Sequence, residues 1–255
     1  MSRLMNLLAA LIFFTRLPFW RLREVPAECF KHVVPYWPLV GWLTGGVTAA
    51  VLWCCGQVLP MATAWLIALV SRLLITGCLH EDGLADFLDG FGGGTSRERI
   101  LTIMKDSHIG TYGVIGLIIY LLLLFQLSTL PLQLLCALVA CGDCWSKCVA
   151  SQLINLLPYA RKEEESKARV VYRRMSLSEE MTALMGGVLP WLGMMTTRCC
   201  PVAFWPALLA PLIPFGLLTL LMKRRIQGYT GDCCGALFLL CELSFYLSCL
   251  IIYSL

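Results

Sequence analysis

The chain has 255 residues, of which 58% are hydrophobic and 14% are charged, and its mean hydropathy is +0.76. A composition this apolar excludes a water-soluble globular protein and indicates a protein that lies within a bilayer. The net charge of +4 is small and scattered along the chain, which argues against nucleic acid as a partner. Most of the 14 cysteines stand in apolar runs, so we expect them to pack between helices rather than to form disulfides or a metal site.

Windows of about 20 apolar residues predict seven transmembrane helices. The predicted spans are 38–59, 61–79, 113–130, 132–157, 181–197, 202–222 and 233–254. The segment from Leu4 to Phe14 is too short to cross and is flanked by arginines, so we expect an interfacial or partly inserted helix that ends at the Pro18 break, and no cleaved signal. The predicted fold class is an all-α polytopic integral membrane protein, with residues 1–255 in a single membrane domain.

Basic residues fall almost entirely on one side of these spans. They are Arg3, Arg16, Arg21, Arg23, Lys31, Arg97, Arg99, Lys105, the cluster 161–174 and the run 223–225, with Arg198 opposite. The positive-inside rule places the N-terminus and the polar segments 80–112, 158–180 and 223–232 in the cytoplasm. Short outward turns near Pro60, Pro131 and Pro201 predict that the first six spans form three antiparallel hairpins.

A run of acidic residues and glycines interrupts the apolar sequence between His80 and Gly113. If the second helix continues past His80, then Asp82, Asp86 and Asp89 lie at i, i+4 and i+7 on one stripe of it. Three carboxylates this close repel one another, and a divalent cation relieves the repulsion; donors that are all oxygen favour magnesium or manganese over zinc. The alternative is a solvated acidic face, but the number of acids and glycines favours a cation and phosphate site.

The glycines at 92–94 should end this helix, and Thr95 or Ser96 should cap another. We expect the chain to fold back there and to return Asp106 toward the other three acids, as a further ligand or as a general base. The basic side chains Arg97, Arg99 and Lys105 suit phosphate oxygens.

Charged residues inside predicted spans should face one another or a wet cavity, because exposure to lipid is costly. They are Arg72, Asp143, Lys147 and Glu242. Asp143 and Lys147 are one helical turn apart and could pair with each other or serve a substrate, and Arg72 could reach the acids or a phosphate. These residues also motivate an alternative function, a secondary transporter of a charged small molecule. The position of the acidic segment at the membrane edge favours an enzyme.

Two further residues have both a functional and a structural interpretation. Asp232 stands near the start of the last span, where it could contact a phosphate at the helix N-terminus or act as an N-cap. Arg16 lies at the interface, where it could bind substrate or anchor the chain by snorkelling.

Motifs spread along the chain resemble those of the cobalamin synthase family, the adenosylcobinamide-GDP ribazoletransferases. The acidic segment contains His80-x-Asp82-Gly83-Leu84-Ala85-Asp86-x-x-Asp89-Gly90 and Ile103-Met104-Lys105-Asp106-Ser107-x-Ile109-Gly110-Thr111-x-Gly113. The terminal motifs are Phe14-Thr15-Arg16-Leu17-Pro18, and Thr230-Gly231-Asp232 with Gly235-Ala236 and Glu242. Their order and spacing extend the resemblance over nearly the whole chain.

The resemblance implies an enzyme of the inner membrane that depends on Mg²⁺. Its substrates would be adenosylcobinamide-GDP and alpha-ribazole or its 5'-phosphate. The ribose 3'-hydroxyl attacks the pyrophosphate and GMP leaves. A homo-oligomer or an association with other corrinoid-assembly enzymes is compatible with this role.

Carried onto this sequence, the resemblance implies that Asp82, Asp86, Asp89 and Asp106 are metal and catalytic acids. Either Asp106 or His80 would accept the proton, and we prefer Asp106. Residues expected to contact substrate are Arg16, Arg72, Arg97, Lys105, Ser107, Lys147, Thr230, Asp232 and Glu242. The chain departs from the family pattern at Glu81, where an apolar residue is common, and at Lys147, where many members have arginine.

Overall fold

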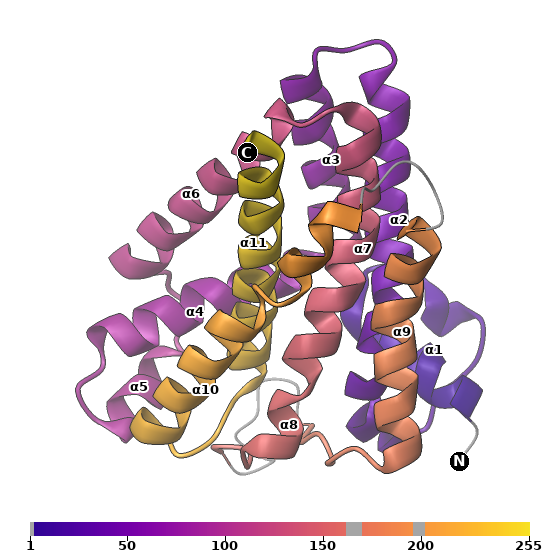
Figure 1. The fold of residues 1–255 in the computed structure, drawn as a ribbon. Helices are drawn as coiled ribbons and strands as arrows, with labels where there is room; N and C mark the ends of the chain where they lie inside the picture. The colour runs from indigo at the N-terminus through magenta and orange to yellow at the C-terminus, as the bar shows by residue number, and fades with distance from the viewer. Residues whose placement is uncertain (1–2, 162–169, 196–201) are drawn as a thin grey trace.

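The computed structural model describes residues 3–161, 170–195 and 202–255, and these residues form helices without any β-strand (Figure 1). The α-helices are α1 (Arg3–Phe14), α2 (Trp37–Gly56), α3 (Met61–Thr76), α4 (Leu79–Gly93), α5 (Arg97–Ile103), α6 (Thr111–Phe125), α7 (Leu132–Ser151), α8 (Leu153–Leu156), α9 (Leu177–Met195), α10 (Leu212–Arg225) and α11 (Gly231–Ser254). Short 3₁₀ segments cover Phe19–Arg21, Ala27–His32, Val34–Tyr36, Gln126–Thr129 and Val202–Leu208. The predicted all-α class is confirmed.

The centre of the molecule is α7, which packs against α2, α9 and α11. Helix α2 approaches α7 closely because it presents glycines at the contact. A Cβ atom on Gly41 would lie 2.9 Å from Asp143 Oδ1, and one on Gly45 would lie 3.0 Å from Asp143 Cβ. The same close contact buries Asp143 of α7 against α2.

Five helical segments of the described chain are long and apolar enough to cross a membrane. They are Val34–Gly56, Thr111–Thr129, Leu132–Leu156, Ala203–Arg225 and Gly231–Ser254. Helices α3 and α4 add a sixth if the two together count as one span. Helix α9 begins beside Glu179 and Glu180 and is not among them. The sequence predicted seven, and length and composition support five or six.

The second predicted span does not continue as one helix past His80. Helix α3 ends at Thr76, and α4 starts at Leu79 after a bend of 88°. The residues between them, Gly77 and Cys78, have φ of 63° and 57°, in the left-handed region that ends a right-handed helix. Two such residues in succession redirect the chain, so the acidic residues lie on a separate helix.

Only the first of the three predicted hairpins packs as expected, between α2 and α3. Helix α6 packs mainly on α4 instead of α7, and Figure 1 shows it inclined away from the central helices. Helix α9 packs on α7 and α2, while α10 packs on α11. The prediction paired neighbours in sequence, but α7 is enclosed by partners from distant parts of the chain.

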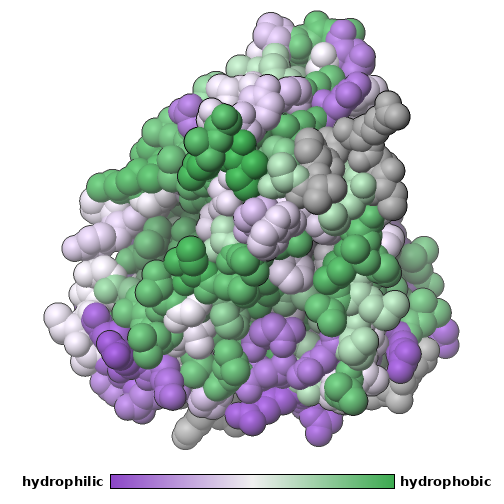
Figure 2. All heavy atoms as spheres, viewed as in Figure 1, coloured by the Kyte–Doolittle hydropathy of each residue, from purple (hydrophilic) through white to green (hydrophobic). Residues whose placement is uncertain are grey.

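The polar segments meet at one end of the molecule, where α1 begins and α5, α8 and the end of α10 lie (Figure 1). Three arginines tie these segments together by donating to backbone carbonyls. The bonds run from Arg97 Nε to Ile226 (3.0 Å), from Arg97 Nη2 to Ala160 (2.6 Å), from Arg161 Nη2 to Leu101 (2.7 Å) and from Arg225 Nη2 to Gly94 (2.7 Å). Figure 2 shows hydrophilic residues gathered along this end and apolar residues above it. The three polar segments therefore share one face, as predicted.

Candidate functional site

Helix α4 carries the three aspartates of the predicted stripe at the polar end of the molecule. Asp86 and Asp89 are buried, whereas Asp82 is exposed. The helix ends at Gly93, and Ser96 caps α5 by accepting a hydrogen bond from the amide of Arg99 at 3.2 Å. The predicted helix end and the predicted cap are both confirmed.

Helix α11 packs along α4 through small residues. A Cβ atom on Gly83 would lie 3.0 Å from the carbonyl oxygen of Asp232, and one on Gly235 would lie 3.3 Å from the Cα of His80. Side chains at either glycine would force the helices apart. The two N-terminal turns consequently lie side by side, and residues of both surround one pocket.

Asp89 holds the start of α6 against α4. Its carboxylate accepts hydrogen bonds from the amides of Gly110 at 2.7 Å and Gly113 at 2.9 Å. A Cβ atom on either glycine would lie 2.5 Å from a carboxylate oxygen of Asp89, so both positions need glycine. An anionic acceptor at a helix N-terminus also complements the helix dipole. Asp89 therefore connects α4 to the start of α6.

Asp106 follows α5 and faces solvent, with 57% of its side chain exposed. Its Oδ1 accepts a hydrogen bond from the amide of His108 at 3.0 Å and lies 2.7 Å from His108 Nδ1. These contacts hold the pKa of the Asp106 carboxyl below its usual value. Among the described residues, no three His, Cys, Asp or Glu side chains are grouped so that they could hold one metal ion. The four aspartates do not form a preassembled cluster.

The pocket between α4 and α11 has a volume of about 120 Å³. Aromatic residues form much of its lining, including Phe14, Trp37 and Tyr159, and Asp82 and Arg161 also line it. Phe14 and Trp37 are buried and Asp82 is exposed, so the pocket is apolar at depth and polar toward solvent.

His80 lines this pocket as a member of a cluster of rings. Its imidazole stacks on Trp37, with ring centroids 5.5 Å apart, and contacts the edge of Phe238 at 4.9 Å. The imidazole Nε2 is buried without a hydrogen-bond partner among the described residues, and so is Trp37 Nε1. Unpartnered buried nitrogens are costly, which makes them candidates for ligand contacts.

Arg72 of α3 lies within a buried network that includes Glu81 of α4. Its Nη1 donates to both carboxylate oxygens of Glu242, at 2.8 and 2.7 Å, and its Nη2 donates to Tyr120 at 2.9 Å and to Glu81 Oε1 at 3.4 Å. Tyr246 donates to Glu242 at 3.1 Å. Glu242 has no exposed surface. The prediction that charges inside the spans face one another is confirmed for this pair.

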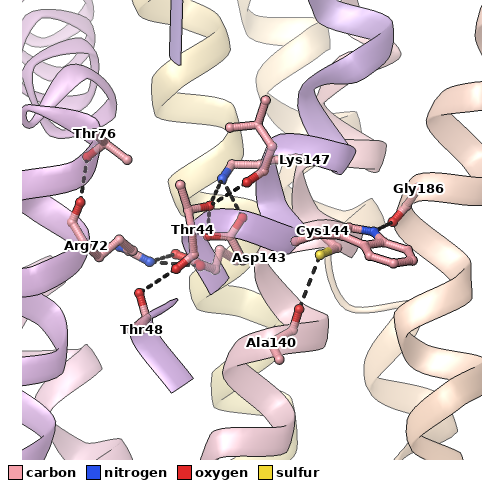
Figure 3. Close-up of polar contacts among 12 residues, drawn as sticks. Thr44, Thr48, Arg72, Thr76, Ala140, Asp143, Cys144, Lys147 and Gly186 are labelled. Carbon is pink, nitrogen blue, oxygen red and sulfur yellow. Dashed lines mark hydrogen bonds and ion pairs between the residues drawn. The ribbon is translucent and has the colours of Figure 1, made fainter. Parts of the chain in front are cut away.

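Asp143 and Lys147 of α7 form a second buried network, drawn in Figure 3. Lys147 Nζ pairs with Asp143 and donates to Thr44 Oγ1 at 2.7 Å, while Thr44 donates to Asp143 Oδ2 at 3.0 Å. The ammonium also lies 5.0 Å from the ring centre of Phe238. The predicted pairing of Asp143 with Lys147 is confirmed.

Three residues that the resemblance assigned to substrate contact are buried and paired inside the protein. They are Arg72, Lys147 and Glu242, with relative exposures of 6%, 1% and 0%. A substrate would have to displace their partners to reach them.

The remaining predicted substrate residues differ in their surroundings. Arg97 is committed to backbone carbonyls, and Lys105 and Ser107 are exposed. Arg16 is exposed and its side chain lies over the bend between α3 and α4, since a Cβ atom on Gly77 would lie 2.4 Å from Arg16 Nε.

At the start of α11, Thr230 is the N-cap and accepts a hydrogen bond from the amide of Cys233 at 3.3 Å. Asp232 is half-buried and lines the pocket. The capping role considered for Asp232 therefore belongs to Thr230.

Residues 6–250 match the family described as Cobalamin-5-phosphate synthase. The chain belongs to this family. A protein of Shewanella sp. (strain W3-18-1) named adenosylcobinamide-GDP ribazoletransferase is 37% identical over 97% of this chain and 94% of its own length. A protein of the same name from Leptothrix cholodnii is 38% identical over 93% of this chain and 92% of its own length. No solved structure matches the chain significantly.

The two departures from the family pattern have a structural context in this member. Glu81 is buried, and its partner is Arg72 of α3. Lys147 offers a compact ammonium to Asp143 and Thr44, for which the fork of an arginine is not needed.

Sequence reasoning did not identify the rings of the pocket. Phe14 appeared only as part of a motif, and Trp37 and Tyr159 stand at the ends of apolar segments without a distinguishing pattern. The only available signal was the density of aromatic residues next to polar loops.

Proposed function

We propose that this chain is an adenosylcobinamide-GDP ribazoletransferase of the cytoplasmic membrane. It would join alpha-ribazole, or its 5'-phosphate, to adenosylcobinamide-GDP and release GMP. The observation that carries this proposal is the match to the family over residues 6–250, with relatives of that name similar over nearly their full length.

We further propose that the enzyme uses Mg²⁺, held by Asp82 and Asp86 together with the substrate's phosphates. Mg²⁺ commonly takes one or two carboxylates and completes its shell with phosphate oxygens and water, so a cluster of three or more acids is not required. Asp82 is exposed beside the pocket, and Asp86 lies one turn further along α4. When bound, the ion would neutralise charge on the pyrophosphate.

The reaction needs a group that receives a proton. As the ribose 3'-oxygen bonds to the phosphorus that stays on the corrinoid, the bond to the GMP oxygen breaks and the hydroxyl proton must leave. We assign this proton to Asp106, because its carboxylate is exposed and can be reached by the hydroxyl group of a substrate. His80 is less suited, because its Nε2 is buried among rings.

The transporter alternative was based on charged residues within the spans. Their pairing, Arg72 with Glu242 and Asp143 with Lys147, explains these charges without a transported ligand.

The proposal is tested with purified protein in detergent. Wild type, Mg²⁺, adenosylcobinamide-GDP and alpha-ribazole phosphate should release GMP, and a chelator should stop the release. Asp82→Asn should lower kcat by about a hundredfold or more with unchanged thermal stability, since it removes an electrostatic group and leaves the fold intact. Glu98→Gln is the matched control, because Glu98 is an exposed acid of the same segment.

Absence of GMP from wild type with both substrates would refute the activity. Equal loss in Asp82→Asn and Glu98→Gln would refute the assignment of Asp82.

We also place the polar end and the N-terminus in the cytoplasm, because most basic residues of the sequence stand in or beside the polar segments that meet at this end. An epitope tag at the N-terminus should resist protease in intact spheroplasts and be digested after lysis. Digestion before lysis would reverse the orientation.

A further inference from the structure

The pocket between α4 and α11 changes character from its depth to its mouth. The deep part consists of rings: Phe14 and Trp37 are 5% and 1% exposed, and their planes stack at 5.1 Å with an angle of 11°. The charged and glycine residues are nearer to solvent, with Asp82 and Gly231 exposed and Asp232 half-buried. A ligand suited to this gradient has a flat apolar part and a polar part.

Size narrows the ligand further. A cavity of about 150 Å³ holds a benzene ring in a protein core, and this pocket of about 120 Å³ opens to solvent at one side. It can therefore enclose about one ring, and the rest of a larger flat base would lie at the open side. A corrin macrocycle with its side chains is many times larger and cannot enter.

Hydrogen-bonding capacity distinguishes between the bases. Two of the rings that line the pocket carry a polar nitrogen, Trp37 Nε1 and His80 Nε2, but both nitrogens are buried beneath its surface. The charged residues of the lining, Asp82, Arg161 and Asp232, are half-buried or exposed and so lie nearer to solvent. Guanine carries several donors and acceptors on its edges, which would lack partners in the deep part of the pocket that the rings line. A benzimidazole joined to ribose through one nitrogen has a single acceptor, its other ring nitrogen.

We propose that this pocket binds the base of the nucleoside substrate, a substituted benzimidazole, packed against the rings of Phe14, Trp37 and His80. This inference rests on the proposed function and deepens it. With the base among the rings, the ribose points toward the mouth, where Asp82 lies. The pocket would thus position the attacking nucleoside beside the acid assigned to the metal, and the corrinoid would approach from outside.

Binding is measured without turnover, by calorimetry on the enzyme in detergent with no second substrate. The probes are alpha-ribazole and guanosine. Wild type should bind alpha-ribazole at least tenfold more tightly than guanosine, because the additional polar groups of guanine would lose their hydrogen bonds to water among the rings.

The comparison with guanosine decides which base the pocket takes. Equal binding of the two nucleosides would refute the preference for an apolar base. Tighter binding of guanosine than of alpha-ribazole would assign the pocket to the guanine nucleotide and overturn the proposal.

A variant at the edge of the pocket tests the site without altering its buried rings. Leu79 lines the pocket and is 39% exposed, so Leu79→Trp should fill the space and weaken alpha-ribazole binding at least tenfold. The matched control is Leu74→Trp, because Leu74 is 71% exposed on α3 and does not line the pocket. Unchanged binding in Leu79→Trp would overturn the proposal.

Turnover separates this inference from the proposed function. Where wild type releases GMP, Leu79→Trp should raise KM for alpha-ribazole and leave KM for adenosylcobinamide-GDP unchanged. Release of GMP with an unchanged nucleoside KM would refute only the pocket. Binding of alpha-ribazole without any GMP release would refute only the activity.

Discussion

Substitution of Arg72 by methionine should destabilise the protein strongly. The change keeps an unbranched apolar side chain and removes the guanidinium that pairs with Glu242, a carboxylate with no exposed surface that receives two of its hydrogen bonds from Arg72. The hydroxyls of Tyr246 and Tyr120, at 3.1 and 3.4 Å, would remain as neutral donors. Breaking a buried ion pair by removing one partner costs about 3–5 kcal/mol, so we expect a loss of that size in the free energy of unfolding.

The assay is reversible unfolding in mixed micelles, with tryptophan fluorescence as the signal. The double variant Arg72→Met with Glu242→Gln should recover at least half of the loss, because the side chain at position 242 is then neutral and needs no cationic partner. Arg23→Met serves as the control, because Arg23 is exposed and its loss should cost less than about 1 kcal/mol. The reasoning is refuted if Arg72→Met is as stable as Arg23→Met, or if the double variant is no more stable than the single one.

Three further predictions concern the segment that carries the aspartates. Asp89→Asn should lower the free energy of unfolding by about 1.5–3 kcal/mol, the range for hydrogen bonds to a charged group, whereas Asp82→Asn should not; equal stability of the two variants would contradict this. Gly113→Ala should cost about 1–3 kcal/mol by overpacking against Asp89, while Gly46→Ala, where nothing lies within 4 Å, should cost nothing. His108→Ala should raise the pKa of Asp106 toward its usual value of about 3.9, because the lowering contact is lost. Asp106 would then be protonated at higher pH, so the acid limb of the kcat profile should move upward; an unmoved limb would exclude Asp106 as the base.

Local patterns of the sequence predicted local structure well. The end of α4 at Gly93, the cap at Ser96 and the pairing of Asp143 with Lys147 all depend on residues within four positions of one another. The shared polar end followed from the distribution of basic residues. Such features depend on helix geometry and on the cost of burying charge, which the sequence displays directly.

Features set by long-range packing were not predictable in the same way. The break at Gly77 and Cys78 stands within a continuous apolar run, where only one glycine hints at it. The wrong hairpins arose because α7 finds its partners through glycines of α2 and side chains of α11, which hydropathy windows cannot identify.

The surroundings of the acids on α4 explain why one helix can carry so many of them. Simple repulsion along a stripe predicted a shared cation, but the described contacts separate the charges by partner: Glu81 lies against Arg72, and Asp89 lies against the amides that begin α6. The first contact attaches the N-terminal half of α4 to α3, and the second attaches its C-terminal half to the start of α6. Asp82 is left at the mouth of the pocket on a helix held at both ends. Rigid support of this kind is what a carboxylate needs if it is to hold an ion at a fixed place beside a substrate.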